Sequence, residues 1–183
     1  ASCKGCKPMD RIDGGVKEAV ALARKSDVVL MAVGLSSKCS GEATSLTSID
    51  LPEAQKELFD AVAATGKPVV MLLVTGRGMT IEPEVEKSKA VLVTWHAGTM
   101  AGPALADVLS GDYNPSGRLT ISFPRAVGQL PMRYNHKSTG RPKLSETDNS
   151  KYISRYMFTW NSPLYGFGDG ISYTTFKYSD LQV

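Results

Sequence analysis

Three short apolar segments, separated by stretches with helical spacing, constrain the fold of this chain more than any other feature. They run from Val28 to Val33, from Val69 to Val74 and from Ala90 to Trp95. Each is almost free of polar residues over the length of a strand, which is typical of strands buried on both faces of a parallel sheet. The intervening stretches are long enough for the helical crossovers that parallel strands need. The sequence therefore predicts an α/β fold.

The stretches around these strands predict the helices. Residues 14–25 place their apolar side chains on one helical face. Further helices are predicted over residues 52–64, beginning at Pro52, and over residues 99–109, where Pro103 must lie in the first turn. Because parallel crossovers are almost always right-handed, we expect a three-layer sandwich. Its mostly parallel, doubly wound sheet would be flanked by helices on both faces.

The pattern changes in the last third of the chain. A short further strand is predicted from Leu119 to Phe123, and residues 124–170 are then rich in Pro, Gly, Asn, Ser and Tyr. An irregular tract of this length is uncommon unless it is functional or lies against something else. No linker divides the sequence, and 183 residues suit one core. We therefore expect a single domain over residues 1–183.

Composition argues against several classes of partner. The net charge is +3, and lysines and arginines alternate with acidic residues without a long run of either sign. Neither nucleic acid nor an anionic membrane surface is therefore predicted as a partner. The longest apolar stretch, Pro68 to Val74, is too short to span a bilayer. The chain starts at Ala1 with no methionine or apolar signal region, so we expect either that a segment was removed or that the chain is a piece of a longer protein.

The three cysteines do not predict a metal site. Cys3 and Cys6 form a C-x-x-C, but no second such pair follows, and only His96 and His136 are left to complete a zinc site. We therefore interpret the pair as incidental thiols and expect neither a metal nor a cofactor.

Three loops leave the predicted sheet at the edge where parallel sheets bind ligands. They cover residues 34–51, 75–78 and 96–99, and each follows a predicted strand. Ligands of open α/β sheets bind at the carboxyl ends of the strands. Because the strands run parallel, all three loops emerge on one side. We therefore expect their side chains to converge.

These loops carry three candidate functional side chains. Glu42 follows Ser40 and Gly41 in a small-residue loop, where partial burial would make it a general acid. The alternative is a solvated loop glutamate. Arg77 either clamps a ligand or pairs with a nearby acid. His96 either shuttles protons or is a hydrogen-bonded structural histidine.

Several longer motifs make the chain similar to one family. They resemble the second, α/β domain of family 3 glycoside hydrolases, of the bacterial periplasmic β-glucosidase type. The resemblance covers nearly the whole chain from about residue 13. The matching segments are Ser40–Ala43 (SGEA), Ile49–Pro52 (IDLP), Gly111–Leu119 (GDYNPSGRL), Phe123–Arg125 (FPR), Val127–Pro131 (VGQLP), Tyr134–Lys137 (YNHK), Thr139–Pro142 (TGRP) and Gly170–Phe176 (GISYTTF).

The resemblance implies a function for the chain as part of a larger enzyme. An N-terminal (β/α)8 barrel, absent from this chain, would supply an aspartate nucleophile and complete the pocket. The whole would be a retaining, exo-acting β-glucosidase that hydrolyses terminal β-D-glucosyl residues of a glucoside or β-linked oligosaccharide. Glu42 matches the acid/base of some members, and Cys39, Ser40 and Ser45 would bind substrate. A periplasmic or secreted location is also implied, and the isolated chain is expected to be inactive.

Two further expectations follow. The aromatic side chains of the C-terminal third either stack on sugar or anchor the tract to a neighbouring domain, so the isolated domain is expected to self-associate. The alternative function is a non-catalytic carbohydrate- or partner-binding module. The chain also departs from the family pattern near Glu42. Leu35, Cys39 and Leu46 stand where the family usually has a polar residue, a methionine and an arginine.

Overall fold

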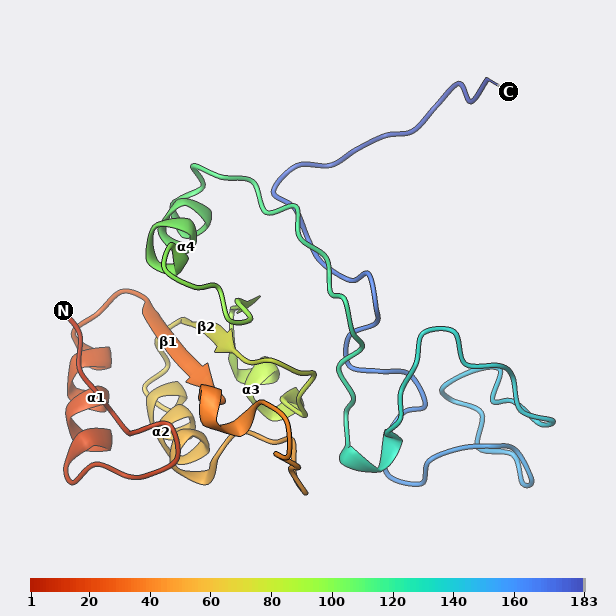
Figure 1. Ribbon diagram of the computed structural model, residues 1–183, viewed down its shortest axis with the longest axis horizontal. Coiled ribbons are helices and arrows are strands. Elements are labelled where there is room, and N and C mark those ends of the chain that lie inside the picture. The colour runs from red at the N-terminus through yellow and green to blue at the C-terminus, as the bar shows by residue number, and fades with distance from the viewer. Residues whose placement is uncertain (183) are drawn as a thin grey trace.

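The computed structural model of the chain describes residues 1–182 and contains one parallel sheet with helices (Figure 1). Nine elements follow one another in the described residues. They are α1 (Gly15–Arg24), β1 (Val29–Gly34), the 3-10 turn η1 (Ser37–Cys39), α2 (Glu53–Ala63), β2 (Val69–Val74), α3 (Glu82–Lys87), β3 (Ala90–Val93), α4 (Ala101–Ser110) and η2 (Val127–Gln129).

The sheet has the strand order β1-β2-β3, and both pairs are parallel. Met71 in the central strand lies opposite Met31 on one side and Val91 on the other. The three predicted strands are thus confirmed to within two residues. The predicted helices are confirmed as α1, α2 and α4, and Pro103 lies in the first turn of α4. Helix α3 was not predicted, because six residues are too few to show a helical period.

One face of the sheet carries the core. Burial alternates along β2, and the buried positions face helix α2, which contacts both α1 and α3. The α/β fold class is therefore confirmed. The core side chains that the strands and α2 share are Met31, Val33, Leu58, Phe59, Val62, Val69, Met71 and Leu73.

The opposite face of the sheet is more open. Leu30 is 56% exposed, Ala32 is exposed, and Leu72 is only partly buried. Helix α4 is apolar but buries none of its residues. The second helical layer that would make the sheet doubly wound is thus not closed within the described residues. The apolar residues on this face explain why the strands read as buried on both sides.

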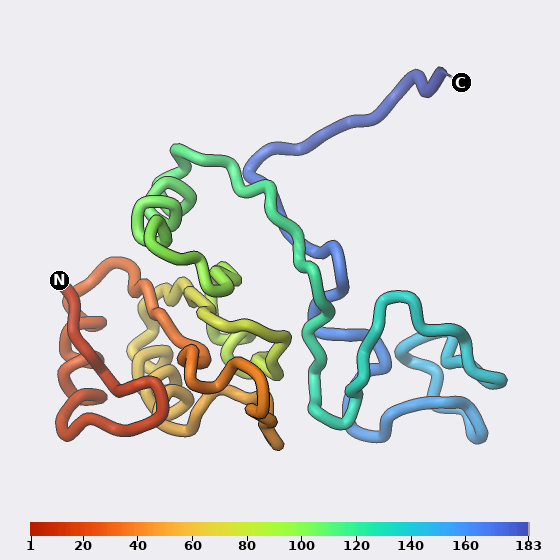
Figure 2. The backbone as a smooth tube through the Cα atoms, in the orientation of Figure 1, coloured from red at the N-terminus to blue at the C-terminus, as the bar shows by residue number. Residues whose placement is uncertain are grey.

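The last third of the chain leaves the α/β unit as an irregular tract (Figure 2). The expected strand from Leu119 to Phe123 is wrong, because only Phe123 forms a bridge, to Tyr165. Leu119 N and Phe123 N donate to the Asp169 and Tyr165 carbonyls at 2.9 and 2.8 Å, without a continuous ladder between them. The irregular character of residues 124–170 is confirmed. Among the described residues, no helix is both long and apolar enough to cross a bilayer.

A partly buried carboxylate organises part of this tract. Glu146 accepts hydrogen bonds from the backbone N–H groups of Asn161 at 3.1 Å and Ser162 at 2.7 Å. The Lys143 ammonium lies 3.3 Å away. Burial acts to raise the pKa of Glu146, but these hydrogen bonds outweigh it and lower that pKa to about 2.

Two leucines test whether the core lies on one face of the sheet. Leu73→Ala is expected to lower the free energy of unfolding by about 2–5 kcal/mol, because that side chain is fully buried. Leu30→Ala, the same change on the open face, is expected to cost about 0.5 kcal/mol or less. Urea unfolding followed by circular dichroism measures both. Equal losses would contradict a one-sided core.

The Glu146 contacts predict a loss of order in acid. Because its folded pKa is depressed, ionised Glu146 stabilises the tract above about pH 4.5, its ordinary value, and this stabilisation disappears as the pH falls through about 2. In a Trp95→Phe background, Trp160 is the sole tryptophan and reports on the tract by fluorescence. We expect its emission to change in that window, and Glu146→Gln to show the acid spectrum already at pH 7. An identical pH response in both proteins would refute this role.

Candidate functional site

The three loops at the carboxyl ends of the strands converge, as predicted. They meet around Gly76, which follows β2. A methyl group added to Gly76 would lie 3.1 Å from Ser40 Oγ, in the loop after β1, and 3.1 Å from His96 Nε2, in the loop after β3. One glycine thus brings together a hydroxyl and an imidazole from the two neighbouring loops.

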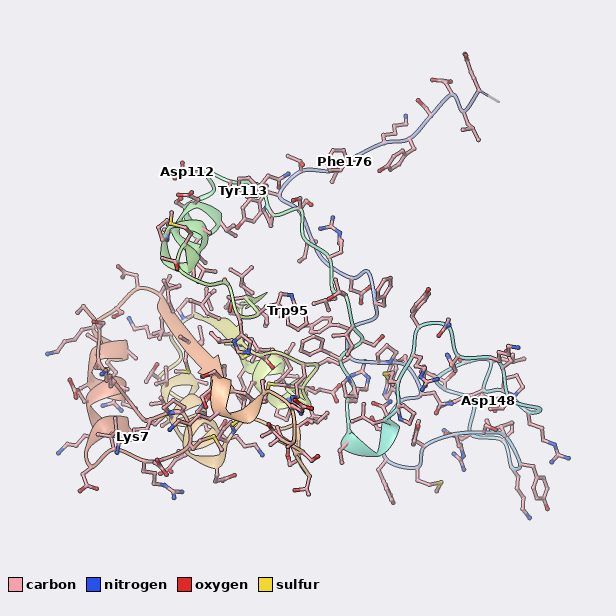
Figure 3. The ribbon with its side chains drawn as sticks, viewed as in Figure 1. Lys7, Trp95, Asp112, Tyr113, Asp148 and Phe176 are labelled. Atoms are coloured by element: carbon pink, nitrogen blue, oxygen red, sulfur yellow. The ribbon has the colours of Figure 1, made fainter. Side chains whose placement is uncertain are left out.

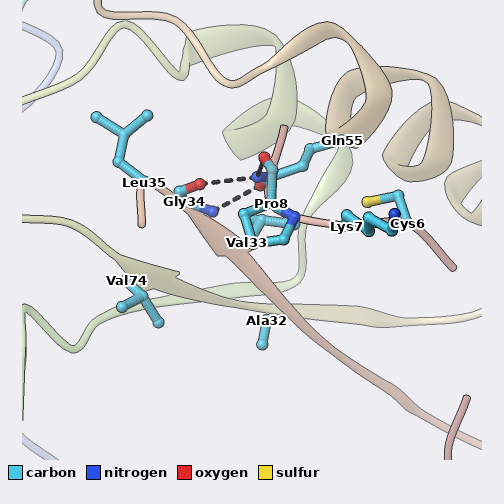
Figure 4. A pocket seen from close by; sticks show the side chains of 9 residues that line it. All are labelled: Cys6, Lys7, Pro8, Ala32, Val33, Gly34, Leu35, Gln55 and Val74. Carbon is cyan, nitrogen blue, oxygen red and sulfur yellow. Dashed lines mark hydrogen bonds between the residues drawn. The ribbon is translucent and has the colours of Figure 1, made fainter. Parts of the chain in front are cut away.

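The end of β1 is fixed by a side chain that the sequence did not single out. Gln55, buried in α2, accepts a hydrogen bond from Gly34 N at 2.7 Å and donates to Gly34 O at 2.8 Å (Figure 4). It also donates to Pro8 O at 2.6 Å. Gly34 has a φ of 136°, and a Cβ atom at this position would overlap the backbone of Val74, so no other residue fits there. The sequence signal for this role is the position of Gln55 on the face of α2 that is otherwise apolar.

A cavity lies beside the two hydrogen bonds between Gln55 and Gly34, at the free edge of β1. Its walls come from the N-terminal segment and from the ends of β1 and β2, together with Gln55. The lining residues are Cys6, Lys7, Pro8, Ala32, Val33, Gly34, Leu35, Gln55 and Val74. The cavity does not include Glu42, Ser40 or His96, so it is separate from the converging loops.

The three residues that depart from the family pattern near Glu42 pack in the hydrophobic core or against it. Leu35 is 5% exposed and Cys39 is 8% exposed, and both belong to the main hydrophobic cluster. Leu46 packs partly against the same cluster. The expected loss of hydrogen-bonding groups is therefore accompanied by apolar packing, which fixes both ends of the Ser40–Ser45 segment to the α/β unit. Cys39 is buried, whereas Ser45 is exposed.

Arg77 holds the same loop rather than an acid. Its Nη2 donates to the Cys39 carbonyl at 2.8 Å, and no carboxylate pairs with it among residues 1–182. The interpretation of Arg77 as an ion-pair partner is therefore wrong. The β1 loop offers a backbone carbonyl within reach and no acid. Arg77 Nε is buried without a partner in the described chain, as is Ser40 Oγ.

Glu42 lies at the exposed tip of this loop. Thr44 Oγ1 donates to the carbonyls of Gly41 at 3.0 Å and Glu42 at 3.2 Å, which closes a tight turn. No described residue contacts the Glu42 carboxylate through a hydrogen bond or ion pair. The partial burial on which its role as an acid was based is therefore not supplied by residues 1–182.

The second carboxylate of this loop is fully engaged. Asp50 accepts a hydrogen bond from Thr80 Oγ1 and lies 3.5 Å from Lys56 Nζ. The hydrogen bond from Thr80 lowers the pKa of Asp50, assisted by Ser48 and Lys56 and against the effect of burial. Asp50 therefore ties the loop to the segment after β2, and Glu42 is the loop carboxylate left for chemistry.

His96 differs from the structural histidine that its position suggested. It is exposed, and its imidazole makes no hydrogen bond to any described residue. Its neighbour Trp95 has a φ of 51°, a left-handed conformation that is uncommon outside glycine. Trp95 is labelled in Figure 3. Its ring packs on the buried Phe123, with ring centroids 6.1 Å apart. His136 is exposed in the irregular tract.

The thiols are all free. Cys3 and Cys6 are partly buried, and burial raises the pKa of both. In residues 1–182, no group of three His, Cys, Asp or Glu side chains is placed to bind a metal ion.

Comparisons with known proteins agree on one family. Residues 7–173 match the model described as "Glycosyl hydrolase family 3 C-terminal domain". The chain is 52% identical to a periplasmic beta-glucosidase of Salmonella typhimurium, over 91% of the chain and 22% of that protein. It is 42% identical to a beta-xylosidase of Formosa agariphila, over 96% of the chain and 23% of that protein.

A solved structure confirms the likeness in three dimensions. The beta-glucosidase of Listeria innocua in complex with glucose superposes with a TM-score of 0.89 at 42% identity, over 93% of this chain and 24% of that one. The chain therefore spans about a quarter or less of these relatives.

Proposed function

This chain belongs to the family of glycosyl hydrolase family 3 C-terminal domains, and we propose that it forms the second domain of a retaining, exo-acting β-glucosidase. The substrate would be a terminal β-D-glucosyl residue of a glucoside or β-linked oligosaccharide. Two relatives carry the names beta-glucosidase and beta-xylosidase, which supports a β-glycoside as the substrate class. A periplasmic or secreted location is proposed from the name of the Salmonella relative.

One observation carries the proposed role of this domain. Of the two carboxylates in the loop after β1, Asp50 is held by Thr80 and Lys56, whereas Glu42 stands exposed at the loop tip. Retaining hydrolysis needs two carboxyl groups about 5–5.5 Å apart, one as nucleophile and one as acid/base. A single free carboxylate supplies one of these roles. We therefore assign the acid/base to Glu42 and the nucleophile to a barrel domain outside this chain.

The exposed surface of the chain supports this division. The open sheet face around Leu30 and the uncovered helix α4 leave apolar side chains in water. Exposed apolar patches of this kind mark interaction surfaces in folded proteins. We propose that the remaining part of the full-length protein covers them. The same surface would make the isolated chain self-associate and leave it without glycosidase activity.

In this arrangement, Glu42 performs both proton transfers. As the acid, it donates a proton to the glycosidic oxygen while the nucleophile attacks the anomeric carbon and the leaving group departs. As the base, it then takes a proton from the water that hydrolyses the glycosyl–enzyme bond. Cys39, Ser40 and Ser45 are proposed to line the sugar site beside it.

The proposed role predicts a large loss of activity for one substitution. In the full-length protein, Glu42→Gln is expected to lower kcat/KM for p-nitrophenyl β-D-glucoside by about 10²- to 10⁴-fold, because an amide cannot transfer the proton. Initial-rate kinetics on the glucoside and the corresponding xyloside measure it. Glu53→Gln, at an exposed position in the first turn of α2, is the matched control and should leave the rate unchanged.

Two results would overturn parts of this proposal. An unchanged rate for Glu42→Gln in an active full-length protein would remove Glu42 from the chemistry. A full-length protein that hydrolyses neither substrate but binds β-linked sugars would favour a non-catalytic binding module instead.

A further inference from the structure

Residues from the loops after β2 and β3 lie close to the loop that carries Glu42, just before its tip. From the β2 side, Arg77 Nη2 donates to the Cys39 carbonyl at 2.8 Å. In the loop after β3, His96 Nε2 lies 3.1 Å from the position that a Cβ atom on Gly76 would take, and Ser40 Oγ lies equally close to that position. Cys39 and Ser40 are consecutive, and Glu42 follows after one glycine. Contacts at these two residues therefore decide where the carboxylate points.

Ser40 has a hydrogen-bonding group that the described chain leaves unused. Its Oγ is shielded from solvent and has no partner among residues 1–182. A buried hydroxyl without a partner costs about 1–3 kcal/mol, so it takes a partner whenever one is in reach. A hydroxyl can donate, and the unprotonated nitrogen of a neutral imidazole can accept. The His96 imidazole is also unpaired among the described residues, and its Nε2 and Ser40 Oγ each lie 3.1 Å from the position that a Cβ atom on Gly76 would take.

Gly76 is a glycine for reasons of space. Its φ lies outside the left-handed region, so its backbone does not require glycine. A Cβ atom would meet both Ser40 Oγ and His96 Nε2 at 3.1 Å, closer than almost all real contacts of this kind. The missing side chain thus allows the hydroxyl and the imidazole to approach each other across the backbone.

The residue that precedes His96 is strained. Trp95 adopts a left-handed conformation, which costs on the order of 1–3 kcal/mol for a residue other than glycine. The contact of its ring with Phe123 and the hydrogen bonds from Thr94 N and Oγ1 to Leu73 O hold this conformation in place. Strain that the surroundings maintain is typical of functional sites. His96 is the next residue, and its Nε2 lies 3.1 Å from the position that a Cβ atom on Gly76 would take.

We propose that His96 is a positioning residue of the glycosidase site. In the full-length protein, the Ser40 hydroxyl and His96 Nε2, which are unpaired in this structure, come together in a hydrogen bond across Gly76 with Nε2 as the acceptor, and this contact holds the Ser40–Glu42 segment in its working conformation. Together with the bond from Arg77 to the Cys39 carbonyl, it fixes both residues that precede the acid/base turn. This inference rests on the proposed function, because it assigns His96 an effect on Glu42 and no contact with substrate.

The test is a double-mutant cycle in the full-length protein with p-nitrophenyl β-D-glucoside. His96→Ala is expected to lower kcat about tenfold, the worth of about one hydrogen bond, with little change in KM. Ser40→Ala should lower kcat to a similar extent, and the loss of its proposed contact with the sugar would show separately as a rise in KM. The double variant should be no slower than either single variant, because both remove the same contact. His96→Gln, which retains an acceptor, should recover most of the activity.

Controls separate this inference from the proposed function. His136→Ala changes the other histidine, which is exposed in the irregular tract, and should leave kcat unchanged. Additive losses at Ser40 and His96, or equal behaviour of His96→Ala and His136→Ala, would overturn the positioning role while the wild type stays active. A rise in KM alone would instead assign His96 to substrate binding and overturn the inference as stated. An inactive wild-type protein would overturn the proposed function and this inference with it.

Discussion

The hydrogen bonds between Gln55 and Gly34 are the interaction on which the arrangement of the site depends. β1 ends at Gly34, where a Cβ atom would overlap the Val74 backbone and where φ has a value that only glycine adopts readily. Gly34 still pairs with Val74 and Leu35 N still donates to the Val74 carbonyl, while Gln55 supplies an acceptor to Gly34 N and a donor to Gly34 O. Because these groups are buried, leaving them unpaired would cost about 1–3 kcal/mol each. These two hydrogen bonds thereby connect α2 to the end of β1, where the loop that carries Glu42 begins.

Everything beyond this point is fixed by contacts between neighbouring loops. The loop after β1 is held through the Cys39 carbonyl by Arg77, and at its far end through Asp50 by Thr80. Apolar packing of Leu35 and Leu46 against the core adds to these polar contacts. The result is a loop whose two ends belong to the rigid α/β unit and whose tip, at Glu42, is exposed. Such a tip is suited to a carboxylate that completes a site on a second domain.

The sequence was sufficient to predict the elements of the fold but not how they are covered. The run Val69–Val74 predicts β2 to the residue, because an apolar run of strand length between turn signals has few alternatives. The apolar runs read as buried on both sides, although Leu72 in β2 is only partly buried and Leu30 in β1 is exposed. Apolar residues record that a face is suited to packing but not which segment covers it, and under the proposed function the neighbouring domain would cover this one. The short strand expected at Leu119 failed because isolated hydrogen bonds took the place of a ladder.

The candidate site was likewise predictable only in part. Periodicity places three loops at one edge of the sheet, and their convergence at Gly76 confirms this. The partners of individual side chains do not follow from periodicity. Arg77 binds a carbonyl rather than an acid, and the place of Gln55 on the apolar face of its helix indicates burial but does not identify Gly34 as its partner. The strain at Trp95 has no signature in the sequence, because it arises from the packing of its ring on Phe123.

The central claim, that Glu42 donates the proton to the leaving group, is tested most directly by the leaving-group dependence of Glu42→Gln in the full-length protein. The measurement is kcat/KM for a series of aryl β-D-glucosides whose phenols range from dinitrophenol to unsubstituted phenol. A strongly acidic phenol leaves without protonation, whereas a weakly acidic one needs the proton. The account predicts a small loss on the dinitrophenyl glucoside that grows steeply as the phenol becomes less acidic. A loss of equal size across the series would contradict it.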